Sequence, residues 1–299
     1  MDSLPPGPPL QVRQARRRSR GLSAALGHLT GNRIALAGLV LVLISVGSAI
    51  LAPLLTPFPP DAMDYQAMLA EPSLVHPLGT DDLGRDVLSR MLHGARLSLA
   101  VSMGAVLLAA AIGVPLGLVA GYVGGLIDEA LMRLVDSLMA LPSLVLALTI
   151  TAVLGPGLVN AMLAIAIVSI PTFTRLMRGQ VLSVKQNEYV AAAHAVGVRP
   201  SLVVLRHVLP NAMNPVIVQA SLAFGFAIIT ESSVSFLGLG AQPPTATWGS
   251  MVQVGFQYLE LAPWFALAPA AAIFVAVLGF NMLGEGLRDL LDPTTRSRG

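Results

Sequence analysis

The chain has 299 residues, of which 55% are hydrophobic and 11% are charged, and its mean hydropathy is +0.74. Because a soluble domain carries roughly 25% charged residues, this composition predicts an all-α polytopic membrane protein. The net charge of only +2 does not indicate a nucleic-acid-binding surface, and the absence of cysteine excludes disulfides and thiolate metal sites.

Six apolar runs are long enough to cross a bilayer, whose hydrocarbon core of about 30 Å requires about 20 helical residues. In chain order they occupy residues 34–55, 97–120, 137–154, 158–174, 213–237 and 263–283. The third and fourth runs are short, and the sequence LGPG at 154–157 predicts a tight turn between them. We therefore predict six transmembrane helices.

The basic residues set the expected orientation, because Lys and Arg accumulate on the cytoplasmic side of membrane proteins. Fifteen of the eighteen fall on one side if both termini are cytoplasmic, and the other side keeps only Arg85, Arg90 and Arg96. This predicts a basic cytoplasmic tail at 1–33, disordered or lying on the anionic inner leaflet, and a second cytoplasmic tail at 285–299. The apolar run after the basic tail is too long for a cleaved signal peptide, so we expect the first span to be retained.

Residues 56–96 are expected outside the membrane, as a loop followed by an amphipathic helix. The sequence GTDD at 79–82 predicts a turn into that helix, after which Asp82, Asp86 and Arg90 share one helix face at four-residue steps. The simplest interpretation is a capped helix at the membrane surface. The same segment could also contact an extracytoplasmic partner protein through Asp81, Asp82, Arg85 and Asp86.

Two features precede the third span. Glycines recur at four-residue steps, a spacing that permits close helix packing, at Gly113, Gly117, Gly121 and Gly125. A short helix then presents a polar face made of Asp128, Glu129, Arg133 and Asp136. This face is either a solvated helix surface or a contact with a cytoplasmic partner.

The segment 188–211, EYVAAAHAVGVRPSLVVLRHVLPN, is a polar island between two apolar runs. Its charged and imidazole groups could not lie unpaired in hydrocarbon, so it must emerge into water, on the cytoplasmic side. The alanines favour a helix that Gly197 ends, Arg199-Pro200 makes a turn, and residues 201–208 form a second short helix closed by Pro210. We predict a helix–turn–helix hairpin held between two spans.

A carboxylate inside the fifth span is the most unusual residue of the apolar runs. Glu231 is flanked by serines that include Ser232 and Ser235. An intramembrane acid is costly and usually faces a cavity or a partner. Two interpretations stay open: a carboxyl hydrogen-bonded to these serines or to a neighbouring helix, and a pathway-lining or gating group.

The hairpin carries a recognisable pattern: Ala192-Ala193, then Gly197, then Leu209-Pro210. This spacing resembles the EAA loop of bacterial ABC importer permeases, in which the loop docks into a groove on the ATPase subunit. Two positions depart from the family's pattern, with Ala191 in place of its Glu and His207 in place of its Ile. Three further segments, in the expected order, resemble the dipeptide/oligopeptide/nickel branch and its C-type subunit: 76–99, 229–248 and 291–293.

The resemblance implies a type I ABC importer permease fold with a permease core at 97–284, an EAA-type loop at 175–212, and a place in the bacterial inner membrane. It implies a second related permease, one or two ATPase subunits and an extracytoplasmic substrate-binding protein as partners. It also implies residues that couple to the ATPase, namely Glu188, Tyr189, Ala192, Ala193, Gly197, His207, Leu209 and Pro210. The function it implies is transport of di- or oligopeptides.

Catalytic motifs are missing from the sequence. The only lysine, Lys185, does not belong to a GxxxxGK[ST] loop, so we expect ATP and Mg to be bound by partner subunits and no cofactor by this chain. We therefore expect no enzymatic activity. A metal site using His76, His93 and the neighbouring acids is a weak alternative, because capping and ion pairing already account for these residues.

The sequence leaves other functions open. The transported solute could be nickel or another small solute, because this branch carries more than peptides. A secondary transporter that works without an ATPase is more distant, and a purely structural scaffold would not need the hairpin. Which residues face the pathway cannot be read from helices that are apolar all round.

Overall fold

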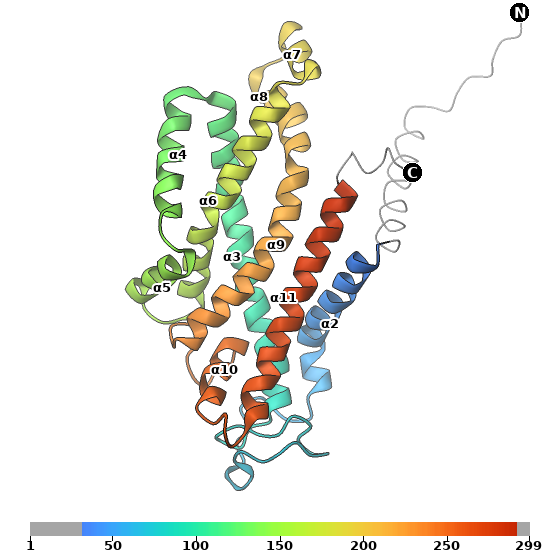
Figure 1. Cartoon of the computed structure of the whole chain (residues 1–299), viewed down its shortest axis with the longest axis vertical. Helices are drawn as coiled ribbons and strands as arrows, with labels where there is room; N and C mark the ends of the chain where they lie inside the picture. The colour runs from blue at the N-terminus through green and yellow to red at the C-terminus, as the bar shows by residue number, and fades with distance from the viewer. Residues whose placement is uncertain (1–31, 292–299) are drawn as a thin grey trace, which may run out of the picture.

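The computed structural model describes residues 32–291, and this part of the chain is a bundle of helices without β-strands (Figure 1). The predicted tail at 1–33 therefore lies almost wholly outside the described residues, as do Asp292, Pro293 and the rest of the C-terminal tail. Five helices are long and apolar enough to cross a membrane: α2 (Arg33–Leu55), α3 (Val87–Val123), α6 (Leu158–Lys185), Pro200–Phe236, which includes α9 (Leu209–Phe236), and α11 (Pro263–Leu291). The prediction of an all-helical membrane protein is confirmed.

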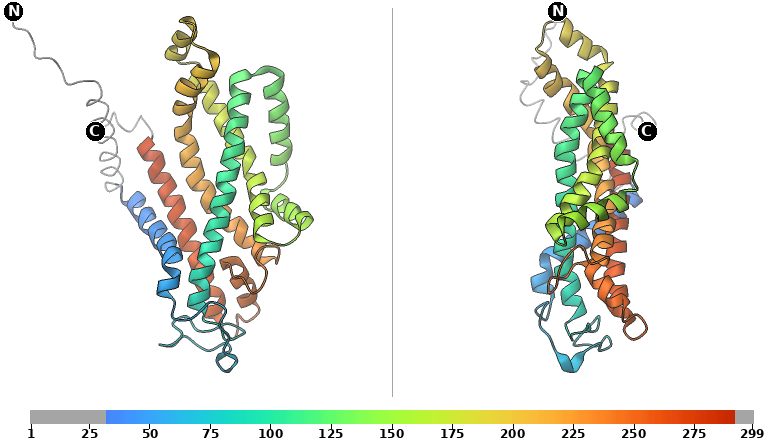
Figure 2. Two further views of the ribbon diagram at one scale, coloured as in Figure 1. Left: turned by 180° about the vertical axis from the view of Figure 1, so that it is seen from behind. Right: turned by 90° about the vertical axis from the view of Figure 1, so that its left-hand side faces the viewer.

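The third predicted span is not one straight helix. Residues 137–154 belong to two helices, α4 (Gly125–Met139) and α5 (Ser143–Leu154), which meet at an angle of 89° and give a sixth crossing only if they are counted together. Pro142 lies at the break, where it removes a backbone donor and disfavours the α conformation at the residue before it. Figure 2 shows α5 lying across the bundle below α4.

The predicted amphipathic helix outside the membrane is wrong as a separate element. Asp86 is the N-cap of α3 and accepts a hydrogen bond from the backbone N–H of Ser89 at 2.7 Å. The helix then runs unbroken from Val87 into the second span. Asp82 therefore precedes the helix, and the helix face predicted for Asp82, Asp86 and Arg90 does not form.

Two other boundaries and one additional helix differ from the prediction. The fourth span continues past 174 to Lys185, and α11 continues past 283 to Leu291. A short helix that we did not predict, α10 (Trp248–Phe256), precedes α11 and begins with a capping box made by Thr247 and Ser250. Helices can extend beyond an apolar run because their polar ends reach water, so hydropathy alone does not locate the ends.

α3 and α6 pack with their backbones in contact at three of the four predicted glycines. A Cβ added at Gly113 would lie 2.8 Å from the carbonyl oxygen of Ile170, and one at Gly121 would lie 2.9 Å from that of Arg178. At Gly117 the carbonyl of Thr174 is closer still. Gly125 does not join this contact, because nothing lies within 4 Å of the same position there. Only glycine permits such an approach.

Ion pairs hold α4 against α6. The guanidinium of Arg178 donates to both carboxylate oxygens of Asp128, at 2.5 and 2.7 Å, and Arg175 pairs with Asp136. Glu129 and Arg133 instead pair with each other along α4. The predicted polar face is therefore divided between α6 and solvent.

α9 lies between α6 and α11, and α2 covers the far side of α11 (Figure 1). The rings of Phe224 and Phe280 join α9 to α11 at a centroid distance of 4.1 Å. Small residues again allow close contact, because a Cβ at Gly38 of α2 would lie 2.5 Å from the backbone nitrogen of Leu283. The two short helices of the hairpin lie at one end of the bundle and the loop 56–86 at the other (Figures 1 and 2).

The α3–α6 contact generates a test. We expect Gly117→Ala to lower the stability of the detergent-solubilised protein by about 1–3 kcal/mol, because its methyl group must push the two backbones apart. Gly179→Ala on α6 is the matched control, since nothing lies within 4 Å of its added Cβ and alanine favours the helix. Thermal unfolding of both variants measures the difference, and an equal melting temperature for the two would contradict the packing argument.

Candidate functional site

The hairpin 188–211 is built from two short helices and a left-handed turn. α7 (Glu188–Ala195) ends in a Schellman motif, with the backbone N–H of Val198 bonded to the carbonyl of Ala193 at 3.1 Å and that of Gly197 to His194 at 3.0 Å. Gly197 has φ +78°, a backbone conformation that glycine adopts without strain. The predicted helix end at Gly197 is therefore present.

The second limb of the hairpin differs from the prediction. α8 (Pro200–Val203) passes directly into a π-helical turn, η2 (Val204–Val208), and then into α9. Pro210 does not close a helix, because it lies in the first turn of α9, which follows η2 without a break. The second limb and the fifth span are consequently one continuous helical rod.

The hairpin has a buried inner face. Val190 and Ala193 of α7 and Val203 and Val208 of the second limb are buried, in one apolar cluster with Val184 of α6. Ala193, one of the predicted coupling residues, therefore supports the hairpin from within. The non-directional packing of these small side chains holds the hairpin on the end of the bundle.

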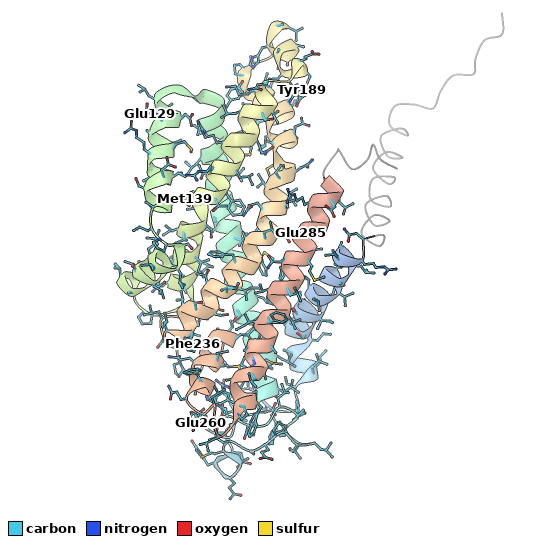
Figure 3. The ribbon with its side chains drawn as sticks, in the orientation of Figure 1. Glu129, Met139, Tyr189, Phe236, Glu260 and Glu285 are labelled. Atoms are coloured by element: carbon cyan, nitrogen blue, oxygen red, sulfur yellow. The ribbon has the colours of Figure 1, made fainter. Side chains whose placement is uncertain are left out.

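The outer face of the hairpin is open, with exposed apolar side chains among charged and polar ones. Five predicted coupling residues are exposed on it: Glu188, Tyr189, Ala192, Gly197 and Pro210. His207 and Leu209 are half-buried, and the ring of His207 faces that of Tyr189 at 6.4 Å. Figure 3 shows Tyr189 at the tip of the bundle.

Sequence reasoning missed part of this surface. Val196 is 78% exposed and Leu205 59% exposed, on either side of the turn. The sequence did contain a signal for this surface, namely apolar residues within a polar loop. A turn that faces only water does not need such residues. Nothing within 4 Å covers the Cβ position of Gly197, so this face is free to receive another surface.

At the other end of the bundle, charged side chains tie down the loop 56–86. Asp81 is fully buried and accepts hydrogen bonds from the backbone N–H of Leu83 and of Arg85, both at 2.9 Å, and from Arg85 Nε at 2.6 Å. Arg90 Nε lies 3.3 Å from the same carboxylate. Asp86, also buried, faces His76 Nδ1 at 3.0 Å while it caps α3.

This burial bears on the predicted partner contact. Asp81, Arg85 and Asp86 are all buried within the chain, so they cannot form an exposed contact surface unless the loop rearranges. The hydrogen bonds and ion pairs of these three residues instead fix the loop on the start of α3. Of the four predicted contact residues only Asp82 is half-buried, with 22% of its side chain exposed.

The ionisation of Asp82 is disfavoured where it lies. Partial burial raises the pKa of its carboxyl above the ordinary value, and the negative charge of the neighbouring Asp81 raises it further. Arg85, 3.5 Å away, opposes this shift only in part.

Glu231 is fully buried where α3, α9 and the start of α10 meet. It accepts a hydrogen bond from Ser235 Oγ at 2.8 Å and also faces the hydroxyls of Ser98 and Thr247. Ser232 is buried too. Glu231 and Ser235 are therefore buried between helices in this structure. Ser232 instead borders a separate cavity of about 370 Å³ between α9, α10 and α11.

The bend between α4 and α5 borders a cavity of about 480 Å³, which α6 and α9 also line. Its polar lining consists of neutral side chains, Ser143, Ser169, Thr172 and Gln219, among apolar ones. Figure 3 places Met139, another lining residue, at the end of α4 beside this space. The sequence did not reveal these residues, because helices that are apolar all round carry no clear polar stripe.

Comparison with known proteins adds to this geometry. Residues 113–297 match the sequence family described as "Binding-protein-dependent transport system inner membrane component", and residues 23–72 match the "N-terminal TM domain of oligopeptide transport permease C".

Similar curated proteins cover nearly the same length. The dipeptide transport system permease protein DppC of Alkalihalophilus pseudofirmus is 45% identical over 91% of this chain and 90% of its own. The glutathione transport system permease protein GsiD of Pectobacterium atrosepticum is 43% identical over 88% of each chain. The probable D,D-dipeptide transport system permease protein DdpC of Escherichia coli K12 is 43% identical over 89% of each chain.

The fold also resembles a solved structure. An inward-facing form of the MetNI methionine ABC transporter aligns with a TM-score of 0.55 at 18% identity, over 67% of this chain and 96% of that one. At this identity the likeness supports the fold alone.

The loop cluster yields a prediction with a built-in control. We expect Asp81→Asn to lower stability by about 3 kcal/mol, because it removes the buried carboxylate shared by two buried guanidinium groups. Among the described residues, Arg85 would keep as a charged partner only the more distant Asp82, at 3.5 Å, and Arg90 only the exposed Asp61, at 3.2 Å. Asp82→Asn should be neutral or stabilising at pH 7, since it removes a carboxylate that is unfavourable when ionised.

The pH dependence separates the two variants further. A raised pKa means that folded Asp82 binds its proton more tightly than the unfolded chain does, so its contribution to stability is lost as the pH rises from about 3.9 through the raised value. Thermal unfolding between about pH 4 and about pH 7 should show Asp82→Asn gaining stability relative to the wild type as the pH rises. A difference between the two proteins that stays constant or shrinks over this range would contradict this assignment.

Proposed function

The chain belongs to the family of binding-protein-dependent transport system inner membrane components, and from this premise we propose that it is the peptide-conducting permease subunit of an ATP-driven importer. As a member of the family it is a membrane-spanning permease that works with a partner permease and with ATPase subunits. The finer assignment concerns the solute, which we propose to be a di- or oligopeptide.

The observation that carries this proposal is the identity of 43–45% with permeases whose names refer to dipeptides, D,D-dipeptides and glutathione. These solutes share amide bonds and ionised ends. The likeness spans about nine-tenths of both chains, so it includes the hairpin, the cavity and the outer loop together.

The hairpin is the proposed point of contact with an ATPase subunit. Its exposed apolar outer face, with Tyr189, Val196 and Leu205, supplies the surface, and the open side of Gly197 allows close approach. ATP and Mg would be bound and used by the ATPase, since this chain has no phosphate-binding loop. Movement of the ATPase would then tilt the continuous rod that runs from α8 into α9.

The cavity beside the α4–α5 bend is the proposed segment of the translocation pathway. Its neutral polar groups can exchange hydrogen bonds with a passing peptide without holding an ion pair. Glu231 would act from behind this pathway by holding α3 and the start of α10 against α9, with Ser235 as its partner on α9. Ser232 would contribute to a second cavity, beside α10 and α11. A gating role would require their burial to change between conformations.

We propose that the hairpin end of the bundle faces the cytoplasm of a bacterial cell and that the loop 56–86 faces outward. The described basic residues support this, because Arg85, Arg90 and Arg96 are the ones at the loop end. Both termini would then be cytoplasmic. An extracytoplasmic binding protein would contact the exposed parts of the loop, Asp82 among them, while Asp81, Arg85 and Asp86 keep it folded.

The proposal is tested by isolating the tagged chain in mild detergent and identifying what comes with it. We expect a second permease, one or two ATPases, and an ATPase activity that a ligand-loaded binding protein stimulates. Uptake into proteoliposomes should be inhibited by di- and tripeptides and not by nickel ions. Inhibition by nickel alone would replace peptides with the metal as the solute, and uptake by the purified chain without an ATPase would overturn the proposal.

A glycine variant tests the hairpin. We expect Gly197→Asp to insert normally and to abolish uptake, because a charged side chain would occupy the open face that meets the ATPase. Aspartate tolerates a positive φ better than most residues, so backbone strain at φ +78° is not the main effect.

The matched control is Gly125→Asp in the turn between α3 and α4, which also has a positive φ (+61°) and nothing within 4 Å of its Cβ position. We expect this variant to retain uptake. If the well-expressed Gly197→Asp variant shows wild-type uptake, the proposed coupling role of this face is contradicted.

A further inference from the structure

Beneath the hairpin, one lysine fastens the end of α6 to the end of α3. Lys185 Nζ donates to the carbonyl of Tyr122 at 2.8 Å and to that of Gly121 at 3.3 Å, and it lies 5.2 Å from the centroid of the Tyr122 ring. These are among the last carbonyls of α3, which ends at Val123. A cation at this position compensates the negative end of the helix and satisfies oxygens that have no partner within it.

The side chain of Tyr122 reaches from the same point to both limbs of the hairpin. Its hydroxyl lies 3.5 Å from Nε2 of His194 at the end of α7 and 3.5 Å from the carbonyl oxygen of Pro200 at the start of α8. Each contact is at the long limit for a hydrogen bond and is weak alone. Together the two contacts hold the turn between α7 and α8 in a defined position relative to α3.

This contact differs in kind from the rest of the hairpin's attachment. The inner face of the hairpin is held by valines and alanine, whose packing has no preferred direction and tolerates sliding. Hydrogen bonds and an ammonium over a ring depend on direction and distance. Tyr122 therefore fixes the orientation of the hairpin, and Lys185 holds Tyr122 against the end of α6, whereas the valines fix only the proximity of the hairpin.

Tyr122 and Lys185 belong to α3 and α6, which pack together as one stiff unit. Gly121 lies against the backbone of Arg178, and the glycine contacts continue down to Gly113, so α3 and α6 cannot shift separately without a clash. The same α6 contributes Ser169, Thr172 and Phe173 to the cavity. A displacement of the hairpin that reaches α3 and α6 therefore reaches the cavity wall.

We propose that Tyr122 and Lys185 form a positioning joint that makes the hairpin and the α3–α6 pair move together, so that displacement of the hairpin opens or closes the cavity. The proposal rests on the proposed function, because it assumes that an ATPase displaces the hairpin. On this proposal, the two residues determine how much solute is moved for each ATP hydrolysed. They do not contribute to the binding of the ATPase or of the solute.

The test uses the full complex in proteoliposomes, with uptake and ATP hydrolysis measured on the same preparation. We expect Tyr122→Phe and Lys185→Met each to lower the uptake per ATP by about fivefold, with complex yield and ATPase activity close to wild type. Lys185→Arg should restore most of the ratio, because it keeps the positive charge near the carbonyls. Tyr258→Phe, a tyrosine near the opposite end of the bundle, is the matched control and should leave the ratio unchanged.

Three results would overturn the proposal. One is a wild-type ratio in both Tyr122→Phe and Lys185→Met. Another is a parallel fall of uptake, ATP hydrolysis and complex yield, which would show a merely structural role. The third is an equal loss in Tyr258→Phe. Failure of the proposed function is distinct, because the wild-type complex itself would then show no ATP-dependent uptake.

A distance measurement addresses the joint directly, because the chain has no native cysteine and accepts spin labels at chosen sites. Leu202 on the hairpin, which is outside the proposed contact surface, and Val123 at the end of α3 are both exposed and can carry the labels. We expect one narrow distance distribution that is the same with and without ATP in the wild type, and a broadened one in Tyr122→Phe. Identical distributions in the two proteins would contradict the joint.

Discussion

The close contact between the backbones of α3 and α6 is the constraint on which the other elements depend. Three glycines bring the helices together, and α4 then has to fold back beside α6, where Asp128 and Asp136 find their arginines. The bend after α4 and the cavity beside it follow from this placement. The hairpin emerges from the far end of α6, so its position is also set by the α3–α6 contact.

Much of this fold could be predicted from the sequence, and the misses have physical reasons. Apolar runs reveal spans, because the bilayer requires length and hydrophobicity, but they do not reveal direction, so the 89° bend at Pro142 was missed. The four-residue glycine spacing predicted close packing correctly at Gly113 and failed at Gly125, because the helix had already ended. Spacing on a helix has meaning only where a helix exists, and for the same reason Asp82 and Asp86 were misplaced.

For the candidate site, the sequence identified the hairpin but could not sort its two faces. Ala192 and Ala193 are neighbours of equal size, yet one is exposed and the other buried, and only the packing on α6 decides between them. Charged residues were harder still. A buried carboxylate such as Asp81 and an exposed one look alike in a sequence, since only the folded loop brings Arg85 and Arg90 onto the same carboxylate.

The π turn at Val204–Val208 sets the rotation of the hairpin about the axis of α9. The N–H of Leu209 bonds to the carbonyl of Val204, five residues back, so this turn holds one residue more than an α-helical turn would. One residue of an α-helix corresponds to a rotation of about 100°. The side of the hairpin offered to a partner is thus displaced by that angle from the side an unbroken α-helix would offer, and a one-residue change in length here would turn a different surface outward.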